Sequence, residues 1–221
     1  MDMNKLIAPL MEMLATAILA VAIVGSGFMG SDLTRDLGLT LLINGLVIAS
    51  ALVLVISISA PISGAHLNPV VTLILFFKKR IDLSQALLFA VAQMIGAIAG
   101  VLFANYLFTE RIVQSSQNLR SGTNIFISEI FATAGLLWII LANLKRSENI
   151  KFLVPLFIFA AMIFTPSTAF ANPAITIARS FTDSFTGIDL QSVPAFLLAQ
   201  LIGACLGYLL ANLFERESDN G

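Results

Sequence analysis

Long apolar stretches separated by short polar connections dominate the chain. Six of them approach or exceed the roughly 20 residues that a helix needs to cross a bilayer core, and they fall at 6–29, 37–60, 82–108, 123–144, 151–167 and 190–214. Two further apolar pieces, Asn68 to Phe77 and Asn172 to Phe181, have about half that length. The pattern predicts an all-α membrane protein with six transmembrane helices and two re-entrant half-helices that enter the membrane and stop.

Each short piece begins with an Asn-Pro pair, in the tripeptides Asn68-Pro69-Val70 and Asn172-Pro173-Ala174. Proline suits the first position of a helix because no intrahelical bond is lost there, and asparagine can accept hydrogen bonds from the free amides of the first turn. Such a helix start at membrane depth needs a protein-lined cavity. Two broken helices in corresponding positions of a membrane protein therefore predict a permeation or binding site near the midplane.

The two halves of the chain also match in sequence. EMLATA at 12–17 pairs with EIFATA at 129–134, and AQMIGA at 92–97 pairs with AQLIGA at 199–204. We divide a single domain, 1–221, into a first repeat at 1–108 and a second repeat at 123–214. Because each repeat contains an odd number of spans, the second must enter the membrane from the opposite side, which predicts an inverted 3+3 repeat.

Composition agrees with a membrane protein and narrows the function. Apolar residues make up 58% of the chain and charged residues 11%, with a mean hydropathy of +0.94. The net charge of −1 gives no basic patch for nucleic acid. No grouping of nucleophile, base and orienting residue supports an enzyme, and no set of ligands suggests a metal or another cofactor.

The positive charges predict the orientation. With the N-terminus in the cytoplasm, eight lysines and arginines lie on that side and four lie outside. Cytoplasmic loops carry an excess of these residues. We therefore expect a multi-pass protein of the plasma membrane with both termini in the cytoplasm.

The segment SGAHLNPVVT at 63–72, taken with the second Asn-Pro-Ala motif and the repeat, resembles the major intrinsic proteins, the aquaporin and aquaglyceroporin channels. The resemblance covers essentially the whole chain and implies a homotetramer in membrane lipid, in which each protomer carries its own pore. Both half-helices would direct positive dipole ends at the pore centre and oppose cations and protons there. The side-chain amides of Asn68 and Asn172 would donate to the oxygen of a passing solute.

In that family, four positions near the outer mouth set selectivity and commonly include an arginine three residues after the second asparagine. That position is Ile175 here, and spacing transfers the other three to Ile48, Ala160 and Ala169. A one-residue shift would put Phe170 in place of Ala169. As assigned, the filter has no arginine, histidine or aromatic residue, and the chain most resembles bacterial members in which an aliphatic residue replaces the arginine, in keeping with a bacterial inner membrane.

An apolar constriction with two alanines should be wide and should reject bulkier neutral solutes only weakly. We expect a passive channel for water and small neutral solutes, namely glycerol, urea-sized molecules or undissociated metalloid hydroxides such as arsenous acid. The alternatives are a coupled secondary transporter on the same inverted-repeat scaffold, a water-selective channel, and a non-conducting structural membrane protein.

Four other polar residues have two interpretations each. Arg179 either rims the outer vestibule or pairs with Asp183 or a lipid phosphate. Glu12 and Glu129 are intramembrane carboxylates, which by default suggest function, but their matched positions favour structural support, and the resemblance implies that they hold the loops before the half-helices. His66, the single histidine, is either a pH gate or a further support of its loop.

Overall fold

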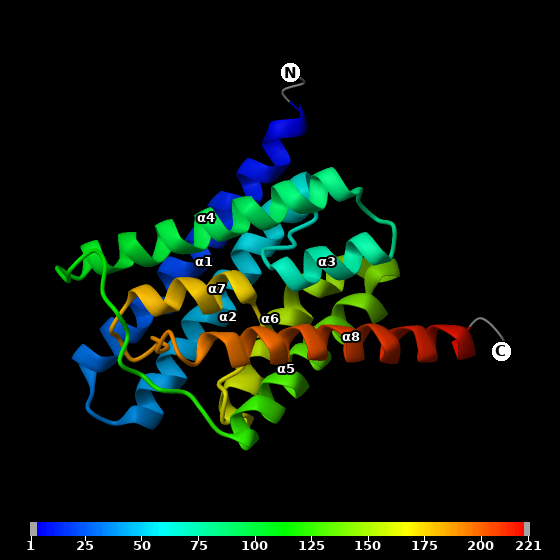
Figure 1. The fold of residues 1–221 in the computed structure, drawn as a ribbon. Helices are drawn as coiled ribbons and strands as arrows, with labels where there is room; N and C mark the ends of the chain where they lie inside the picture. Colours follow the sequence, from blue (N-terminus) through cyan, green and yellow to red (C-terminus); the bar gives the residue numbers. More distant parts are fainter. Residues whose placement is uncertain (1–3, 219–221) are drawn as a thin grey trace.

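The computed structural model describes residues 4–218, and every regular element within that range is a helix (Figure 1). The long helices are α1 (Asn4–Leu33), α2 (Leu37–Ser63), α4 (Leu83–Leu107), α5 (Thr123–Ala142), α6 (Ile150–Phe164) and α8 (Val193–Ser218). A 3₁₀ turn, η1 (Leu144–Asn149), precedes α6. Among the described residues, six helices are long and apolar enough to cross a membrane. The predicted six-span, all-α architecture is confirmed.

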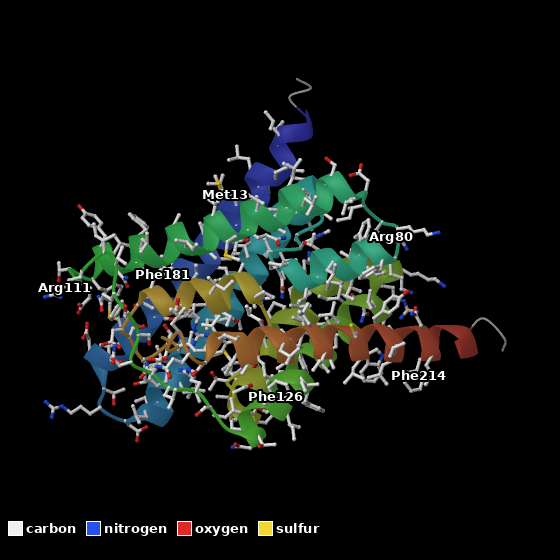
Figure 2. The ribbon with its side chains drawn as sticks, in the orientation of Figure 1. Met13, Arg80, Arg111, Phe126, Phe181 and Phe214 are labelled. Atoms are coloured by element: carbon white, nitrogen blue, oxygen red, sulfur yellow. The ribbon has the colours of Figure 1, made fainter. Side chains whose placement is uncertain are left out.

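The two half-helices lie in the middle of the bundle (Figure 1). They are α3 (Pro69–Phe77) and α7 (Pro173–Ala178), the latter continued by the 3₁₀ turn η2 (Arg179–Phe181). Both begin near the centre and run to opposite ends: Figure 2 shows Arg80, just beyond α3, at one end of the bundle and Phe181 toward the other. This antiparallel placement is the inverted repeat that the odd number of spans predicts.

Close helix crossings hold the long helices around this centre. Helix α1 packs on α4, and α5 packs on α8 in the corresponding way. A Cβ atom added to Gly96 would lie 2.1 Å from the carbonyl oxygen of Met13, and one added to Gly203 would lie 2.5 Å from that of Ile130. The glycines of the two matching segments are therefore required by the backbones that they face, as expected of small residues at membrane helix crossings.

The distribution of side chains also fits a membrane. Large apolar residues lie exposed on the outward faces of the long helices, for example Ile18, Leu54, Leu87 and Leu209. Polar side chains are instead buried inside, beside the half-helices. An exterior of this kind suits lipid, whereas a polar interior marks a functional region in a membrane protein.

Candidate functional site

The candidate site begins with the two asparagines that cap the half-helices. The Oδ1 atom of Asn68 accepts a hydrogen bond from the backbone amide of Val70 at 3.0 Å. The Oδ1 atom of Asn172 accepts from the amides of Ala174 at 3.1 Å and Ile175 at 3.3 Å. Pro69 and Pro173 occupy the first helical positions, so the capping chemistry is as the sequence predicts. Val70 and Ala174 are themselves buried.

The same asparagines join the two halves of the chain. The Nδ2 atom of Asn68 donates to the carbonyl oxygen of Ala171 at 2.7 Å, and Nδ2 of Asn172 donates to the carbonyl oxygen of Leu67 at 2.8 Å. Each amide group has two hydrogens, so each asparagine keeps one further donor. Both residues line the central cavity, where that donor is available to a solute.

The loops before the half-helices have an unusual backbone conformation that repeats in both halves. Positive φ angles occur at Ala65 (53°) and Leu67 (54°) in the first loop, and at Ala169 (47°) and Ala171 (46°) in the second. Left-handed backbone at residues other than glycine costs of order 1–3 kcal/mol each. Surrounding groups must therefore hold these loops in place.

Glu12 supports the first loop. Its carboxyl oxygens accept hydrogen bonds from the backbone amides of His66 at 3.0 Å and Leu67 at 2.6 Å, and from Nε2 of Gln93 at 2.8 Å. The same Gln93 nitrogen donates to Oγ1 of Thr72 on α3 at 2.9 Å. The network ties helices α1 and α4 to the loop and to the half-helix that follows.

Glu129 supports the second loop in the corresponding way. It accepts from the backbone amides of Phe170 at 3.2 Å and Ala171 at 2.6 Å, and from Nε2 of Gln200 at 2.8 Å. Gln200 Nε2 also donates to Oγ1 of Thr176 on α7 at 2.8 Å. Both glutamates have an exposed fraction of 0% and neither lines the cavity. These contacts are those of a structural support, the interpretation that the matched positions favour.

A narrow cavity of about 90 Å³ runs past both asparagines. A buried space needs ≳ 10–15 Å³ to hold one water, so this one has room for a short file of water molecules. Its walls are mainly aliphatic and come from α1, α2, α5, α6 and the two loops with their half-helices: Leu19, Ile23, Ile48, Leu52, Ile56, Ala65, His66, Leu67, Asn68, Val71, Leu136, Ile140, Ile150, Val154, Ile158, Met162, Thr168, Ala169, Phe170, Ala171, Asn172, Ile175 and Arg179.

The structure brings three of the four expected filter residues to this cavity. Ile48, Ala169 and Ile175 line it, whereas Ala160 does not, and Met162 lies in the wall instead. Residues two apart on a helix point about 200° away from each other, and the lining residues of α6 recur every four positions. Ala160 therefore lies on another face of α6 than the residues that line the cavity, and its place in the filter stays a prediction.

His66 also lines the cavity. Its Nδ1 atom lies 3.1 Å from Oγ1 of Thr72, and its ring packs edge-on against Phe89 with the centroids 5.2 Å apart. The backbone amide of His66 is bound to Glu12. These contacts support the loop, as one of the two interpretations predicts.

Arg179 is buried, with 7% of its surface exposed, and forms part of the cavity wall. Its Nε atom donates to the carbonyl oxygen of Thr186, and its guanidinium carbon lies 3.4 Å from the centroid of the Phe170 ring. Asp183 instead accepts from the backbone amide of Gln117 at 3.0 Å. The expected alternative, an Arg179–Asp183 pair, is therefore not found.

Arg120, before α5, was not anticipated from the sequence. Its Nε and Nη2 atoms donate to the carbonyl oxygens of Gly187 at 3.0 Å and Phe185 at 3.2 Å, and its guanidinium carbon lies 5.1 Å from the centroid of the Phe170 ring. Burial lowers the pKa of Arg120 from its ordinary value, but a guanidinium remains protonated in proteins. Arg120 is a single positive charge in a polar connection, and nothing in the sequence around it predicts a contact with the distant loop at 185–187.

The chain is similar to known proteins both in sequence and in fold. A family model described as "Major intrinsic protein" matches residues 2–171. The aquaglyceroporin AqpS of Rhizobium meliloti (strain 1021) is 41% identical over 194 residues, which cover 87% of this chain and 83% of that protein. Aquaporin TIP1-2 of Musa acuminata is 30% identical over 216 residues, covering 92% and 84%.

Among solved structures, the fold is similar to the X-ray structure of the aquaglyceroporin from Plasmodium falciparum. The TM-score is 0.64, with 22% sequence identity and coverage of 95% of both chains. At that identity the similarity concerns the fold alone.

Proposed function

The chain belongs to the major intrinsic protein family, and from this premise we propose that it conducts water and small neutral solutes passively through the cavity between α3 and α7. As a member of that family it is a multi-pass membrane channel for water and small solutes and not an enzyme. The proposal adds the class of solute, which includes glycerol, urea-sized molecules and undissociated metalloid hydroxides such as arsenous acid.

A single observation supports this proposal most strongly: Asn68 and Asn172, each of which donates only one hydrogen bond to the protein, both line an otherwise mainly aliphatic cavity. A solute oxygen that passes between them can accept from both, so that a chain of hydrogen-bonded waters is reoriented there. The positive ends of α3 and of α7 with its continuation η2 add a barrier to cations and protons. Uncharged solutes with oxygen atoms would pass most readily along such a cavity.

The range of solutes depends on the outer constriction. Ile48, Met162, Ala169 and Ile175 present only apolar groups, which bind no ion and hold no water firmly. Ile175 stands at the position for which the resemblance to the family implies an arginine. We propose that the aliphatic residues of this constriction leave room for solutes larger than water.

A proton-coupled transporter commonly uses intramembrane carboxylates that reach the substrate. The carboxyl groups of Glu12 and Glu129 are instead fully buried behind the loops and engaged by backbone amides. These contacts therefore favour a passive channel over a coupled transporter.

The setting in the cell follows from charge and family. We propose that both termini lie in the cytoplasm, that the protein resides in a bacterial inner membrane, and that it assembles as a homotetramer. The exposed apolar faces of the long helices suit contact with lipid and with neighbouring protomers.

Stopped-flow light scattering on proteoliposomes tests the proposal. Fluxes of water, glycerol and arsenous acid would be compared for the wild type, Ile175→Arg and the volume-conserving control Ile175→Leu. We expect the wild type and the leucine variant to pass all three solutes and the arginine variant to suppress the two larger ones. A wild type that passes water alone would refute the broad solute class, and one that passes nothing would refute the channel.

A further inference from the structure

The side chain of Arg179 adds a polar group to the wall of the cavity beside the outer constriction. The position of Arg179 in the sequence does not predict this. Arg179 lies four residues after Ile175, so its Cα atom is about 6 Å further along the helix axis. Side chains on a helix point back toward the N-terminus of that helix. The guanidinium of Arg179 packs on the ring of Phe170, a residue that precedes the half-helix altogether. The charged group thus lies beside the loop that precedes the half-helix and, like Ile175, lines the cavity.

The terminal nitrogens of this guanidinium are available to a solute. Nε is used by the Thr186 carbonyl oxygen, but neither Nη atom has a hydrogen-bond partner among residues 4–218. The side chain is more than nine-tenths buried and lines the cavity. Unused donors on a buried charged group are costly unless water or a ligand reaches them. The cavity is the place from which a solute oxygen can do so.

Several contacts fix the guanidinium in that position. Arg120 holds the carbonyl groups of Phe185 and Gly187, which flank Thr186, the residue that binds Nε of Arg179. The backbone amide of Ile188 donates to the carbonyl oxygen of Arg179 at 3.2 Å. Rigid placement of a donor lowers the entropy lost when a solute binds.

The packing of α1 also helps to fix the guanidinium of Arg179. A Cβ atom added to Gly27 would lie 2.5 Å from Cγ2 of Thr186, so α1 and this loop are in direct contact. Any side chain at Gly27 would displace the loop that carries the anchor of Arg179. The position of the guanidinium therefore depends on a helix that does not itself contribute a polar group to the filter.

Arg179 forms no direct ion pair with a carboxylate in the described part of the chain. It faces Phe170, whose ring also lies beside Arg120, and Asp183 is engaged by the amide of Gln117. An unpaired positive charge in a narrow, poorly hydrated passage repels cations strongly. The same charge strengthens hydrogen bonds to neutral oxygen acceptors.

We propose that Arg179 is a specificity-determining residue of the pore: its Nη groups donate to the hydroxyl oxygens of permeating solutes, and its charge excludes cations. This inference rests on the proposed channel function and deepens it. The outer constriction then has an aliphatic side, formed by Ile48, Met162 and Ile175, and one polar edge that enters from the next turn of the half-helix.

The experiment compares Arg179→Met, which keeps length but removes charge and donors, with Arg179→Lys, which keeps charge but loses the planar fork. Arg111→Met is the matched control, because Arg111 is an exposed arginine at the same end of the bundle (Figure 2). Full-length protein in proteoliposomes would be assayed for water and glycerol flux and for sodium conductance, each normalised to reconstituted protein.

For Arg179→Met we expect sodium conductance to rise at least tenfold and the glycerol-to-water flux ratio to fall about tenfold, the effect of losing one hydrogen bond to a charged group. For Arg179→Lys we expect conductance to stay low while the ratio falls. Arg111→Met should match the wild type. If Arg179→Met does not fold, Arg179→Lys decides alone by its flux ratio.

Two results would overturn this inference. One is an unchanged glycerol-to-water ratio in both Arg179 variants, and the other is a sodium conductance in Arg179→Met equal to that of the control. Either result with a wild type that conducts glycerol refutes the role of Arg179 and leaves the channel intact. A wild type without any neutral-solute flux refutes the proposed function itself, so the two failures are distinguishable.

Discussion

Replacing Glu129 by glutamine is the sharpest test of how the pore loops are held. The carboxyl group accepts three hydrogen bonds, from the amides of Phe170 and Ala171 and from Gln200 Nε2. Glutamine has the same shape but only one acceptor oxygen. The amide nitrogen of the glutamine would face at least one of these three donors. One hydrogen bond is then lost, and two N–H groups point at each other without an acceptor between them.

The size of the effect follows from these contacts. Losing a hydrogen bond to a charged group removes about 1.5–3 kcal/mol, and leaving a buried donor unsatisfied costs about 1–3 kcal/mol more. The sum is about 2.5–6 kcal/mol. For a chain of this length 1 kcal/mol corresponds to about 2–4 °C, so the apparent melting temperature should fall by about 5–24 °C.

The assay is thermal unfolding of the detergent-solubilised protein, followed by size-exclusion chromatography, together with abundance in the membrane. Glu12→Gln serves as an internal comparison, because Glu12 also accepts from Oγ of Ser63 and therefore loses at least as much. Glu148→Gln, at an exposed glutamate before α6, is the control and should leave the melting temperature unchanged.

Solute flux through the folded fraction of Glu129→Gln distinguishes a structural role of Glu129 from a direct role in transport. If Glu129 only holds the loop, the water, glycerol and arsenous acid fluxes of reconstituted Glu129→Gln keep the order of the wild type. A variant with normal abundance and melting temperature but with altered solute order, or with flux newly independent of an imposed pH gradient, would refute the support role and favour a coupled transporter.

Three further predictions follow from the packing and from the cavity wall. Gly203→Ala should destabilise the protein by about 1–3 kcal/mol, because the new Cβ atom would lie 2.5 Å from a backbone oxygen. Gly38→Ala, at an exposed site, should not destabilise it. Apparent melting temperatures of the two variants test this prediction. Ala169→Cys should make water flux sensitive to mercurials, since Ala169 lines the cavity, while the wild type, with its single cysteine exposed on α8, should be insensitive; block of the wild type would contradict this. Met162→Ala should raise the glycerol-to-water flux ratio and Ala160→Ser should not, because Met162 lines the cavity; the reverse result would favour Ala160 as the filter residue.

Much of the fold could be predicted because its signals are local. The length of each apolar stretch sets a span, and proline with asparagine sets the start of each half-helix. The rotation of α6 could not be predicted, because Val154, Ile158 and Met162 lie in a helix that is apolar all round. A helix of that kind has no polar stripe to show which face meets the cavity.

The surroundings of Arg179 depend on contacts between distant segments. Its ring partner precedes the half-helix, and the loop that binds it is held by Arg120, some 60 residues earlier in the chain. The positive φ angles at Ala65, Ala169 and Ala171 were equally hidden, because no glycine stands at these positions to mark them. Only the matched glutamates pointed to the loops that need support.

The exchange of asparagine hydrogen bonds between the halves has a consequence for biogenesis. Asn68 finds its acceptor 103 residues further along the chain, and the carbonyl of Leu67 finds its donor 105 residues further along. Synthesis proceeds from the N-terminus, so the first three spans can enter the bilayer while their pore loop still lacks these partners. The interior of the channel is therefore completed late, by the arrival of the second half, and a ribosome that stops before Ala171 leaves a membrane-inserted but unfinished pore.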